Sequence, residues 1–305
     1  MKSNFKKLPG SKVELEIRLD QAEFKPYWDA AYERALQGVH LKGFRPGTAP
    51  KELADAAIDK DKVFEAATRE AIRWSMDDVT KEQEWTIIDT PQIDVEDAKL
   101  GISYKASLTI FPEVKLGNYK KIAKRVFAER KAVTVELKDI DETLEWLRKS
   151  RSKPTSIVGS PTQKASEPVL PPLDDEFAKS LGKFENVEAL KKSVADGVKM
   201  EKEYKETDRL RLKALEEIIA DSQIDTPEVM VQKTEERLAK QLGPMLKASG
   251  KSEAEVLKEL RERAKKNVDT NLVLYKIAET EKLEYTPEQG VESEKVFQFL
   301  EAQAK

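Results

Sequence analysis

The chain contains no cysteine in 305 residues and only one histidine, His40. Without cysteine it forms no disulfide and performs no thiolate chemistry, and zinc sites built on cysteine or on several histidines are excluded. A Ser–His–Asp hydrolase would have to use His40, but no GxSxG motif accompanies it. Nucleotide binding is poorly supported because both the GxGxxG spacing and the Walker ending are absent. We therefore expect no catalytic residues, no metal and no cofactor.

Long apolar runs and a marked net charge are also lacking. No stretch is long enough to span a bilayer, and the basic N-terminus, Met1 to Lys7, is not followed by the apolar run of a signal peptide. We therefore expect no membrane partner and a cytoplasmic location. Basic residues number 54 and acidic residues 57, so any contact with nucleic acid has to rest on a local patch.

What the chain does contain is charge. Charged residues make up 36% of the sequence and hydrophobic residues 39%, a mix that favours an extended, largely helical molecule of about two domains. The acid pairs Asp77–Asp78 and Asp174–Asp175 could bind a metal. On exposed helix ends and in linkers, however, such pairs are usually solvated caps, and we expect that role here.

The first part of the chain is typical of an α+β domain. Val13 to Leu19 alternates strictly between apolar and polar residues, which predicts a half-buried strand. A helix over 62–81 is expected to carry Trp74 within its apolar stripe. The other expected elements are helices over 24–38 and from Pro50, and strands over 85–95 and 102–111.

The remainder is expected to be helical on both sides of a linker. Lys120 to Lys131 is interpreted as a basic connector, and 138–151 as a helix. Ser152 to Pro172 holds five prolines among serines, threonines and lysines, which is typical of a linker. Beyond it we expect an open bundle of four helices, which begin near Val187, at Thr226–Pro227, at a Ser252–Glu255 capping box and at Thr286–Pro287.

The segment from His40 to Pro50 stands out between two helical patterns. It has two glycines and two prolines in eleven positions, and it carries a lone aromatic residue, Phe44, beside Arg45. Glycine permits unusual backbone turns and proline stops helices, so the segment is expected to be a loop. It could be an ordinary connector in which Phe44 packs against Leu41, or a surface that contacts another molecule.

Residues 43–50, Gly-Phe-Arg-Pro-Gly-Thr-Ala-Pro, resemble the ribosome-docking signature of the trigger factor family. The family pattern is Gly-Phe-Arg-x-Gly-Lys-x-Pro, and five of its six fixed positions are matched. The resemblance continues through Phe111 to Val114 and returns at Leu173 to Gly182, which is similar to the start of the family's C-terminal domain. It covers most of the chain, strongly at the loop and loosely in the helices.

The resemblance implies an ATP-independent chaperone that docks transiently at the ribosomal exit tunnel and shields nascent chains. The implied fold is an α+β N-terminal ribosome-binding domain followed by a mainly α-helical, extended C-terminal chaperone domain. It also implies roles in protein folding, protein transport and cell division. The implied partners are the ribosome, through protein or rRNA, and unfolded polypeptides, with the chain a monomer or a weak homodimer. The implied ribosome-binding residues are Lys42, Gly43, Phe44, Arg45, Pro46, Gly47 and Pro50.

Two departures from the family pattern change these expectations. Thr48 replaces the signature lysine and Pro46 fills a position that is often lysine, so we expect weaker docking than is usual. The family also carries a prolyl isomerase domain of the FKBP type, but here the linker takes its place. We therefore expect no isomerase activity and divide the chain into a ribosome-binding domain (1–115), a connector and arm helix (116–151), the linker (152–172) and a helical chaperone domain (173–305).

Other functions stay open at this point. A helical scaffold or a SurA-like periplasmic chaperone would also explain the helices, although neither explains the loop. A residual prolyl isomerase and an rRNA-binding protein are further alternatives. The near-neutral charge and the acid-rich helices speak against RNA binding as the main activity.

Overall fold

The computed structural model describes residues 1–39, 50–97, 101–152, 170–248, 250, 252–283 and 293–304. The chain forms two compact units, one from Met1–Leu116 with Ser222–Thr280 and the other from Gly117–Asp221 with Glu281–Lys305. The elements of the first unit are β1 (Lys2–Leu8), β2 (Lys12–Asp20), α1 (Gln21–Gly38), α2 (Lys51–Ala57), α3 (Lys60–Glu82), β3 (Gln92–Asp97), β4 (Gly101–Thr109), β5 (Val114–Lys115), β6 (Gln223–Ile224), α8 (Glu228–Ala248) and α9 (Glu253–Thr280). Those of the second unit are α4 (Tyr119–Ala128), α5 (Leu137–Arg151), α6 (Asp175–Leu181), α7 (Val187–Asp221) and α10 (Ser293–Ala302).

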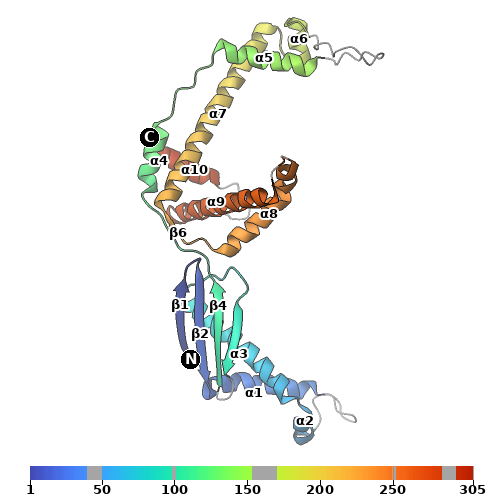
Figure 1. The fold of residues 1–305 in the computed structure, drawn as a ribbon, viewed down its shortest axis with the longest axis vertical. Coiled ribbons are helices and arrows are strands. Elements are labelled where there is room, and N and C mark those ends of the chain that lie inside the picture. The colour runs from blue at the N-terminus through green and yellow to red at the C-terminus, as the bar shows by residue number, and fades with distance from the viewer. Residues whose placement is uncertain are drawn as a thin grey trace, which may run out of the picture. The chain divides into compact units, whose positions relative to one another are not determined.

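An antiparallel sheet with the order β1-β2-β4-β3 forms the N-terminal part of the first unit, which we call the head (residues 1–116). The predicted alternation on β2 is confirmed, because Val13, Leu15, Ile17 and Leu19 are all buried. Helices α1 and α3 pack on this apolar face (Figure 1). The opposite face carries the polar residues of each strand, so the head is a layer of helices on one side of a sheet.

Side chains at the helix ends fix where the helices of the head begin. Asp20 and Glu23 form a capping box at the start of α1, each side chain bonding the backbone N–H of the other. Asp59 caps α3 by accepting from two backbone N–H groups of its first turn. These caps satisfy donors that a helix terminus otherwise leaves unpaired.

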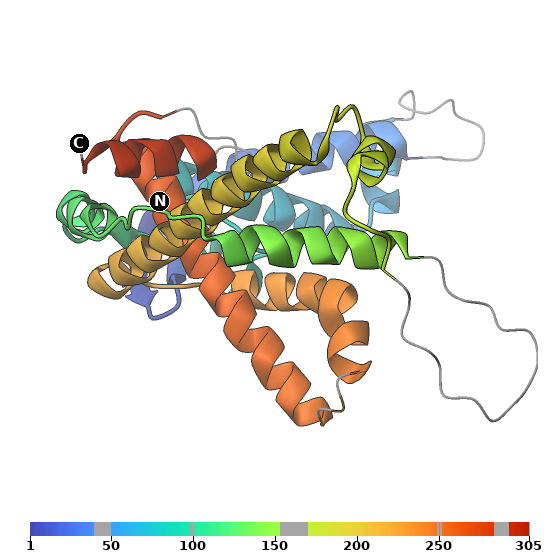
Figure 2. The ribbon, with the colours of Figure 1, turned by 90° about the horizontal axis from the view of Figure 1, so that it is seen from above.

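Helices α8 and α9 form a hairpin that belongs to the same unit as the head (Figure 2). Its core contains Val256, Leu260 and Ala264, which follow one face of α9. The predicted Ser252–Glu255 capping box is confirmed, with both backbone N–H groups bonded to the opposite side chain. Helix α8 begins directly after Thr226–Pro227, as expected, and the Thr226 hydroxyl donates to Asp269 at 2.5 Å.

The second unit is built along α7, a single helix of 35 residues. The α5 and α6 helices pack at one part of it around the buried residues Leu144, Phe177 and Leu190. Asp174 caps α6 by accepting from the backbone N–H of Phe177 at 2.8 Å, as expected for that acid pair. The α4 and α10 helices pack elsewhere in the unit, and Val296 and Leu300 of α10 are fully buried.

Several expectations were wrong. Residues 120–131 are not a simple connector, because most of them form α4, with Tyr119, Ala123 and Val126 buried on one face. Strand β1 was not predicted, and the strand expected over 85–95 is regular only from Gln92. The helices do not form one bundle, because α8 and α9 belong to the first unit while α7 and α10 belong to the second. The expected helix start at Thr286–Pro287 lies outside the described residues.

Candidate functional site

The segment singled out by its Gly-Phe-Arg sequence follows α1 and precedes α2 in the chain. Lys42, Gly43, Phe44, Arg45, Pro46 and Gly47 all lie outside the described residues, as does His40. Pro50 is described and exposed, with φ −55° and ψ 136°, at the position before the first residue of α2. Its C=O accepts from the backbone N–H of Leu53 at 3.0 Å and of Ala54 at 3.1 Å. Pro50 therefore starts α2, as predicted.

Contacts between α1, α2 and α3 hold the two ends of this segment. The hydroxyl of Tyr32 on α1 donates to the carboxylate of Asp55 on α2, which raises the pKa of Tyr32. Ala54 is buried and anchors α2, while Leu53 beside it is 52% exposed. Arg34 on α1 bonds Glu70 on α3. The segment is thus carried by helices that are fixed to one another, although Tyr32 and Asp55 gave no signal in the sequence.

Aromatic side chains pack between α1 and α3. Phe24 and Trp28 of α1 both contact Phe64 of α3, with ring centroids 5.7 Å and 6.4 Å apart.

Trp74, which was expected in the apolar stripe of α3, is instead 51% exposed, with the Arg73 guanidinium 5.9 Å from its ring centroid. The expectation for Trp74 was wrong because it lies beside the buried face and not on it.

The head is clamped to the α8–α9 hairpin at the turn between β1 and β2. The carboxylate of Asp225 accepts from the backbone N–H of Gly10 at 2.7 Å and of Ser11 at 2.5 Å. The Ser11 hydroxyl donates to the backbone C=O of Asp225 at 2.6 Å. Nearby, Phe111 packs edge-on against Tyr275 of α9, with ring centroids 5.3 Å apart. These contacts, which we call the Asp225 clamp, were missed because the sequence carries no signal for a pair 215 positions apart.

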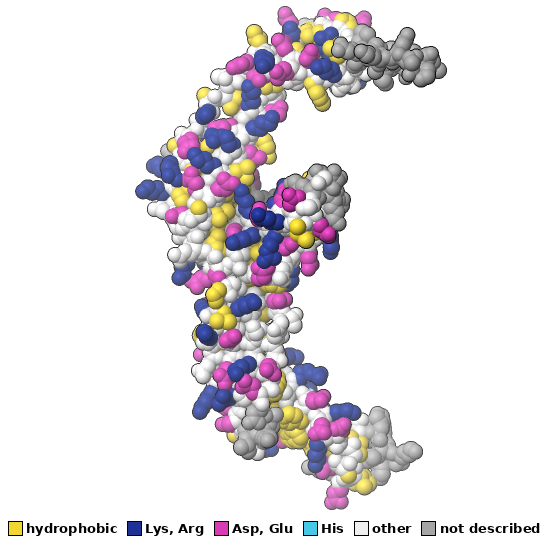
Figure 3. All heavy atoms as spheres, viewed as in Figure 1, with side chains coloured by type: hydrophobic (Ala, Val, Ile, Leu, Met, Phe, Trp, Pro, Cys, Tyr) yellow, Lys and Arg dark blue, Asp and Glu magenta, His cyan; other side chains and the backbone are white. Residues whose placement is uncertain are grey.

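Large apolar side chains are exposed on each unit separately. On the second unit they include Trp146 of α5, 66% exposed, and Met200 and Tyr204 of α7, 70% and 66% exposed. On the α8–α9 hairpin, Met245 is 61% and Leu257 52% exposed. Figure 3 shows hydrophobic side chains scattered among charged ones on the viewed face, without one broad patch. Such dispersed apolar groups fit weak contacts with many partners.

A dense set of ion pairs fixes α10 within the second unit. Arg211 of α7 bonds Glu294 and Glu301 of α10 at 2.8 Å and 2.7 Å, and this contact lowers the pKa of Glu294. Lys120 of α4 pairs with Glu281 at 2.7 Å and lowers its pKa in the same way. These charges therefore have a structural role, because they hold α7, α10 and α4 to one another within the second unit.

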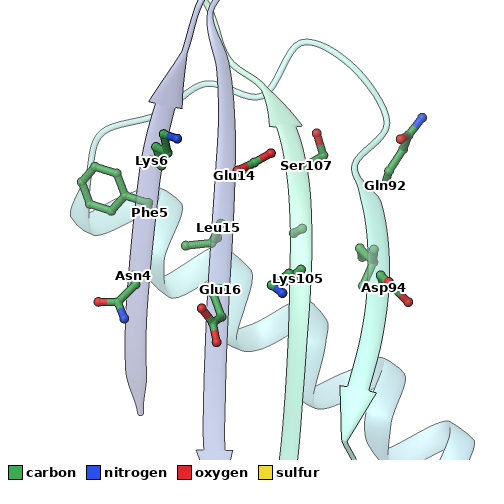
Figure 4. A pocket seen from close by; sticks show the side chains of 12 residues that line it. Asn4, Phe5, Lys6, Glu14, Leu15, Glu16, Gln92, Asp94, Lys105 and Ser107 are labelled. Atoms are coloured by element: carbon green, nitrogen blue, oxygen red, sulfur yellow. The ribbon is translucent and has the colours of Figure 1, made fainter.

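Among the described residues, no group of three or more His, Cys, Asp or Glu side chains is placed to hold a metal ion. None of the described helices is both long and apolar enough to cross a membrane. An open hollow of about 610 Å³ lies across the strands of the head sheet, and its labelled side chains are mostly polar (Figure 4).

Comparison with known proteins shows which family shares this sequence and this fold. Residues 1–147 match the family model described as bacterial trigger factor protein (TF), and residues 186–304 match that of its C-terminus. Curated relatives include trigger factors from Clostridium botulinum, 26% identical over 91% of this chain and 85% of the relative, and from Nocardia farcinica, 23% identical over 92% and 78%. A solved trigger factor chaperone, described by its promiscuous substrate recognition in folding and assembly, has the same fold, with a TM-score of 0.53, 17% identity and coverage of 99% and 98%.

The α+β head, the long helices and these matches define a ribosome-associated chaperone, which interacts with the ribosome and with nascent chains. The chain belongs to the trigger factor family. The expected fold class and the expected chaperone function are confirmed, and the alternatives of a generic scaffold or a SurA-like module are not favoured.

Proposed function

We propose that residues 42–50 are the ribosome-docking element of this chaperone. Phe44 buries its ring against a ribosomal protein at the exit tunnel, while Arg45 meets acidic side chains or rRNA phosphate. Lys42, Gly43, Pro46, Gly47 and Pro50 shape or support the same contact. The observation that carries the proposal is the Gly-Phe-Arg-x-Gly sequence in a chain of this family, between helices held together by Tyr32 and Asp55.

The expected strength of this contact is modest. Burial of a phenylalanine contributes roughly 1.5–3 kcal/mol, and a hydrogen bond to a charged group roughly 1.5–3 kcal/mol. Micromolar binding needs about 8 kcal/mol, so these two side chains support a transient contact. Thr48 in place of the usual lysine weakens it further.

Co-sedimentation with ribosomes tests the docking proposal. The double variant Phe44→Ala, Arg45→Ala should lower the affinity by about two orders of magnitude, because both main contacts are lost. The matched control is Arg73→Ala with Trp74→Ala, which removes an arginine and an exposed aromatic elsewhere on the head. Equal binding by the wild type and the Phe44–Arg45 variant would show that the docking proposal is wrong.

We further propose that the exposed apolar side chains of the helices hold unfolded segments of clients. Met200 and Tyr204 lie one turn apart on α7 and are both well exposed, so a client can cover them together. Replacing both with serine should reduce suppression of aggregation of a refolding client. Replacing the exposed pair Lys199 and Glu203 with serine is the matched control, at the same spacing and one position earlier. Equal activity of the two variants would contradict the proposal.

We also propose that the chain lacks prolyl isomerase activity. The two family matches leave residues 148–185 between them, too few for an isomerase domain. The span aligned with the Clostridium botulinum relative is 367 positions, longer than this chain, so that relative carries residues in the span that this chain lacks. An isomerase assay on a proline peptide tests this, and clear turnover would overturn the proposal.

We also propose how the functions are divided along the chain. We assign ribosome binding to 1–115, the arm to 116–151, the linker to 152–172 and client holding to 173–305, in a cytoplasmic monomer or weak homodimer. Contact with rRNA predicts that ribosome binding falls steeply as salt rises. A flat salt dependence would assign the contact to ribosomal protein alone, and analytical ultracentrifugation would give the oligomeric state.

A further inference from the structure

Strand β3 is an open edge of the head sheet. Within the described residues it pairs with β4 on one side only, at the end of the order β1-β2-β4-β3. Its residues from Gln92 to Glu96 are all exposed, including Ile93 at 41% and Val95 at 42%. An edge strand that nothing covers presents a row of backbone N–H and C=O groups that another strand can pair with.

The two faces of β3 differ in chemistry. Ile93 and Val95 stand opposite Ala106 and Tyr104 of β4, on the face that packs against the helices. Asp94 stands opposite Lys105, on the polar face (Figure 4). Asp94 forms no hydrogen bond or ion pair with the described part of the chain, whereas Glu96 pairs with Lys105 at 2.5 Å. The edge therefore offers acids on one side and exposed aliphatic groups on the other.

The same sheet shows what kind of strand such an edge accepts. Strand β2 also alternates acidic and apolar residues, and β1 pairs with it. In that pairing Lys6 of β1 stands opposite Glu14, and Phe5 stands opposite Leu15. Strand β3 repeats the alternation of β2, but its outer side has no partner strand among the described residues. A segment with basic residues on one face and apolar residues on the other is complementary to it.

We propose that the outer edge of β3 binds an extended segment of a client chain by strand addition. The segment alternates basic and apolar residues, so that its lysine or arginine side chains meet Asp94 and Glu96 while its apolar side chains cover Ile93 and Val95. The backbone bonds hold any extended sequence, and the side chains select among them. The register shift between Val95 and Asp97 ends the regular edge, which limits the site to a short segment.

A second copy of the chain is the main competing occupant. Two β3 edges would bring Asp94 and Glu96 of each copy together, which opposes a symmetric pairing. The β1 edge of another copy is basic, with Lys2 and Lys6, but such a head-to-tail contact leaves one β1 edge and one β3 edge free, so it would lead to rings or open chains of copies and not to a symmetric dimer. A transient client segment satisfies the same chemistry without assembly.

Peptide binding followed by fluorescence polarisation tests the proposal on the full chain. The first probe is a short labelled peptide of alternating lysine and valine. Its glutamate–valine counterpart should bind much more weakly. The same lysine–valine peptide N-methylated at its central amides should bind at least about tenfold more weakly, because several main-chain hydrogen bonds are lost. Equal binding of the methylated and unmodified peptides would overturn strand addition.

Protein variants locate the site. Asp94→Asn with Glu96→Gln should weaken binding of the lysine–valine peptide about fivefold, because two exposed charge pairs are lost. The control, Glu33→Gln with Glu65→Gln, makes the same charge change on exposed helix positions of the head and should bind as the wild type does. Equal weakening in both variants would mean that net charge attracts the peptide, and the site would be rejected.

Two further measurements distinguish client binding at β3 from ribosome docking and from self-association. The β3 proposal rests on the client-binding part of the proposed function and does not involve residues 42–50. The Phe44→Ala, Arg45→Ala variant should therefore bind the peptide normally, even if ribosome docking fails. If sedimentation shows that the chain associates with itself and the peptide dissolves the assembly, a second copy occupies the edge and the client assignment is wrong.

Discussion

Replacing Asp225 with alanine should destabilise the unit that contains the head and the α8–α9 hairpin. The carboxylate accepts from the backbone N–H groups of Gly10 and Ser11 at 2.7 Å and 2.5 Å. These two residues have φ of 78° and 54°, a left-handed conformation that is unfavourable for the serine. The Asp225 clamp therefore holds both a turn and an interface.

The magnitude follows from the bonds that are lost. A hydrogen bond to a charged group contributes roughly 1.5–3 kcal/mol, and one of the two donors, Gly10, is exposed and partly screened, so we expect a loss of about 2–4 kcal/mol. Asp225→Asn keeps one acceptor oxygen without the charge and should lose about half as much. The bond from the Ser11 hydroxyl to the backbone C=O of Asp225 is present in both variants.

Amide hydrogen exchange and urea unfolding measure the effect. In Asp225→Ala the amides of Gly10 and Ser11 should exchange far faster, and the stability of this unit should fall. Asp196→Ala removes an exposed aspartate of α7 that forms no hydrogen bond with the described part of the chain, and it serves as the matched control. The reasoning is refuted if Asp225→Ala changes neither the exchange of the turn nor the stability by more than the control does.

The second unit offers two further tests. A Cβ at Gly117 would lie 2.0 Å from the Asp221 carboxylate and 2.6 Å from its backbone oxygen, whereas one at Gly197 in α7 meets nothing within 4 Å. Thermal unfolding should show Gly117→Ala destabilised and Gly197→Ala stabilised by about 0.5–1 kcal/mol, and the opposite order would contradict the packing. Arg211 holds the pKa of Glu294 below its ordinary value of 4.5, so the contribution of this pair is complete above that pH and is lost as the pH falls below it. The protection of α10 against hydrogen exchange, relative to the intrinsic exchange rate at each pH, should therefore fall on acidification below about pH 4.5, and less so in Arg211→Gln; an equal pH dependence in both proteins would assign the effect to other groups.

The elements that the sequence predicted are those whose burial repeats at a regular period. Strand β2 is recognisable because one face is fully buried and the other is exposed. Strand β1 has no such signal, since six of its seven residues are exposed and Phe5 stands alone as a large exposed apolar group. It is a strand because β2 offers it hydrogen bonds along its whole length. Pairing of that kind cannot be read from a single segment.

The high content of basic residues explains why α4 was not predicted. Lysines and arginines dominate residues 120–131, which is why the sequence indicated a connector. Tyr119, Ala123 and Phe127 nevertheless follow a helical spacing and are buried against α7 and α10. Long basic side chains can cover the outside of such a helix without disturbing its apolar face.

The candidate site was recognised by the identity of its residues more than by physical reasoning. Glycine and proline content predicted a loop over 40–50, but the assignment of Phe44 and Arg45 to docking came from the family resemblance. The bond between Tyr32 and Asp55, which joins the helices on either side of this segment in the chain, could not be found in this way, because a tyrosine–aspartate bond between two helices leaves no periodic signal. The Asp225 clamp escaped notice for the same reason.

Weak contacts at each surface suit the work of a chaperone without a driven release step. Complete burial of Met200 and Tyr204 would contribute at most about 3–6 kcal/mol, less than the roughly 8 kcal/mol that micromolar binding requires. A client is therefore held only when it engages several surfaces at once, because each contact raises the effective concentration for the next. As the client buries its own apolar residues in a folded core, these contacts are lost together. Release then follows from folding itself, and the proposed transient docking through residues 42–50 would keep the chaperone where new clients emerge.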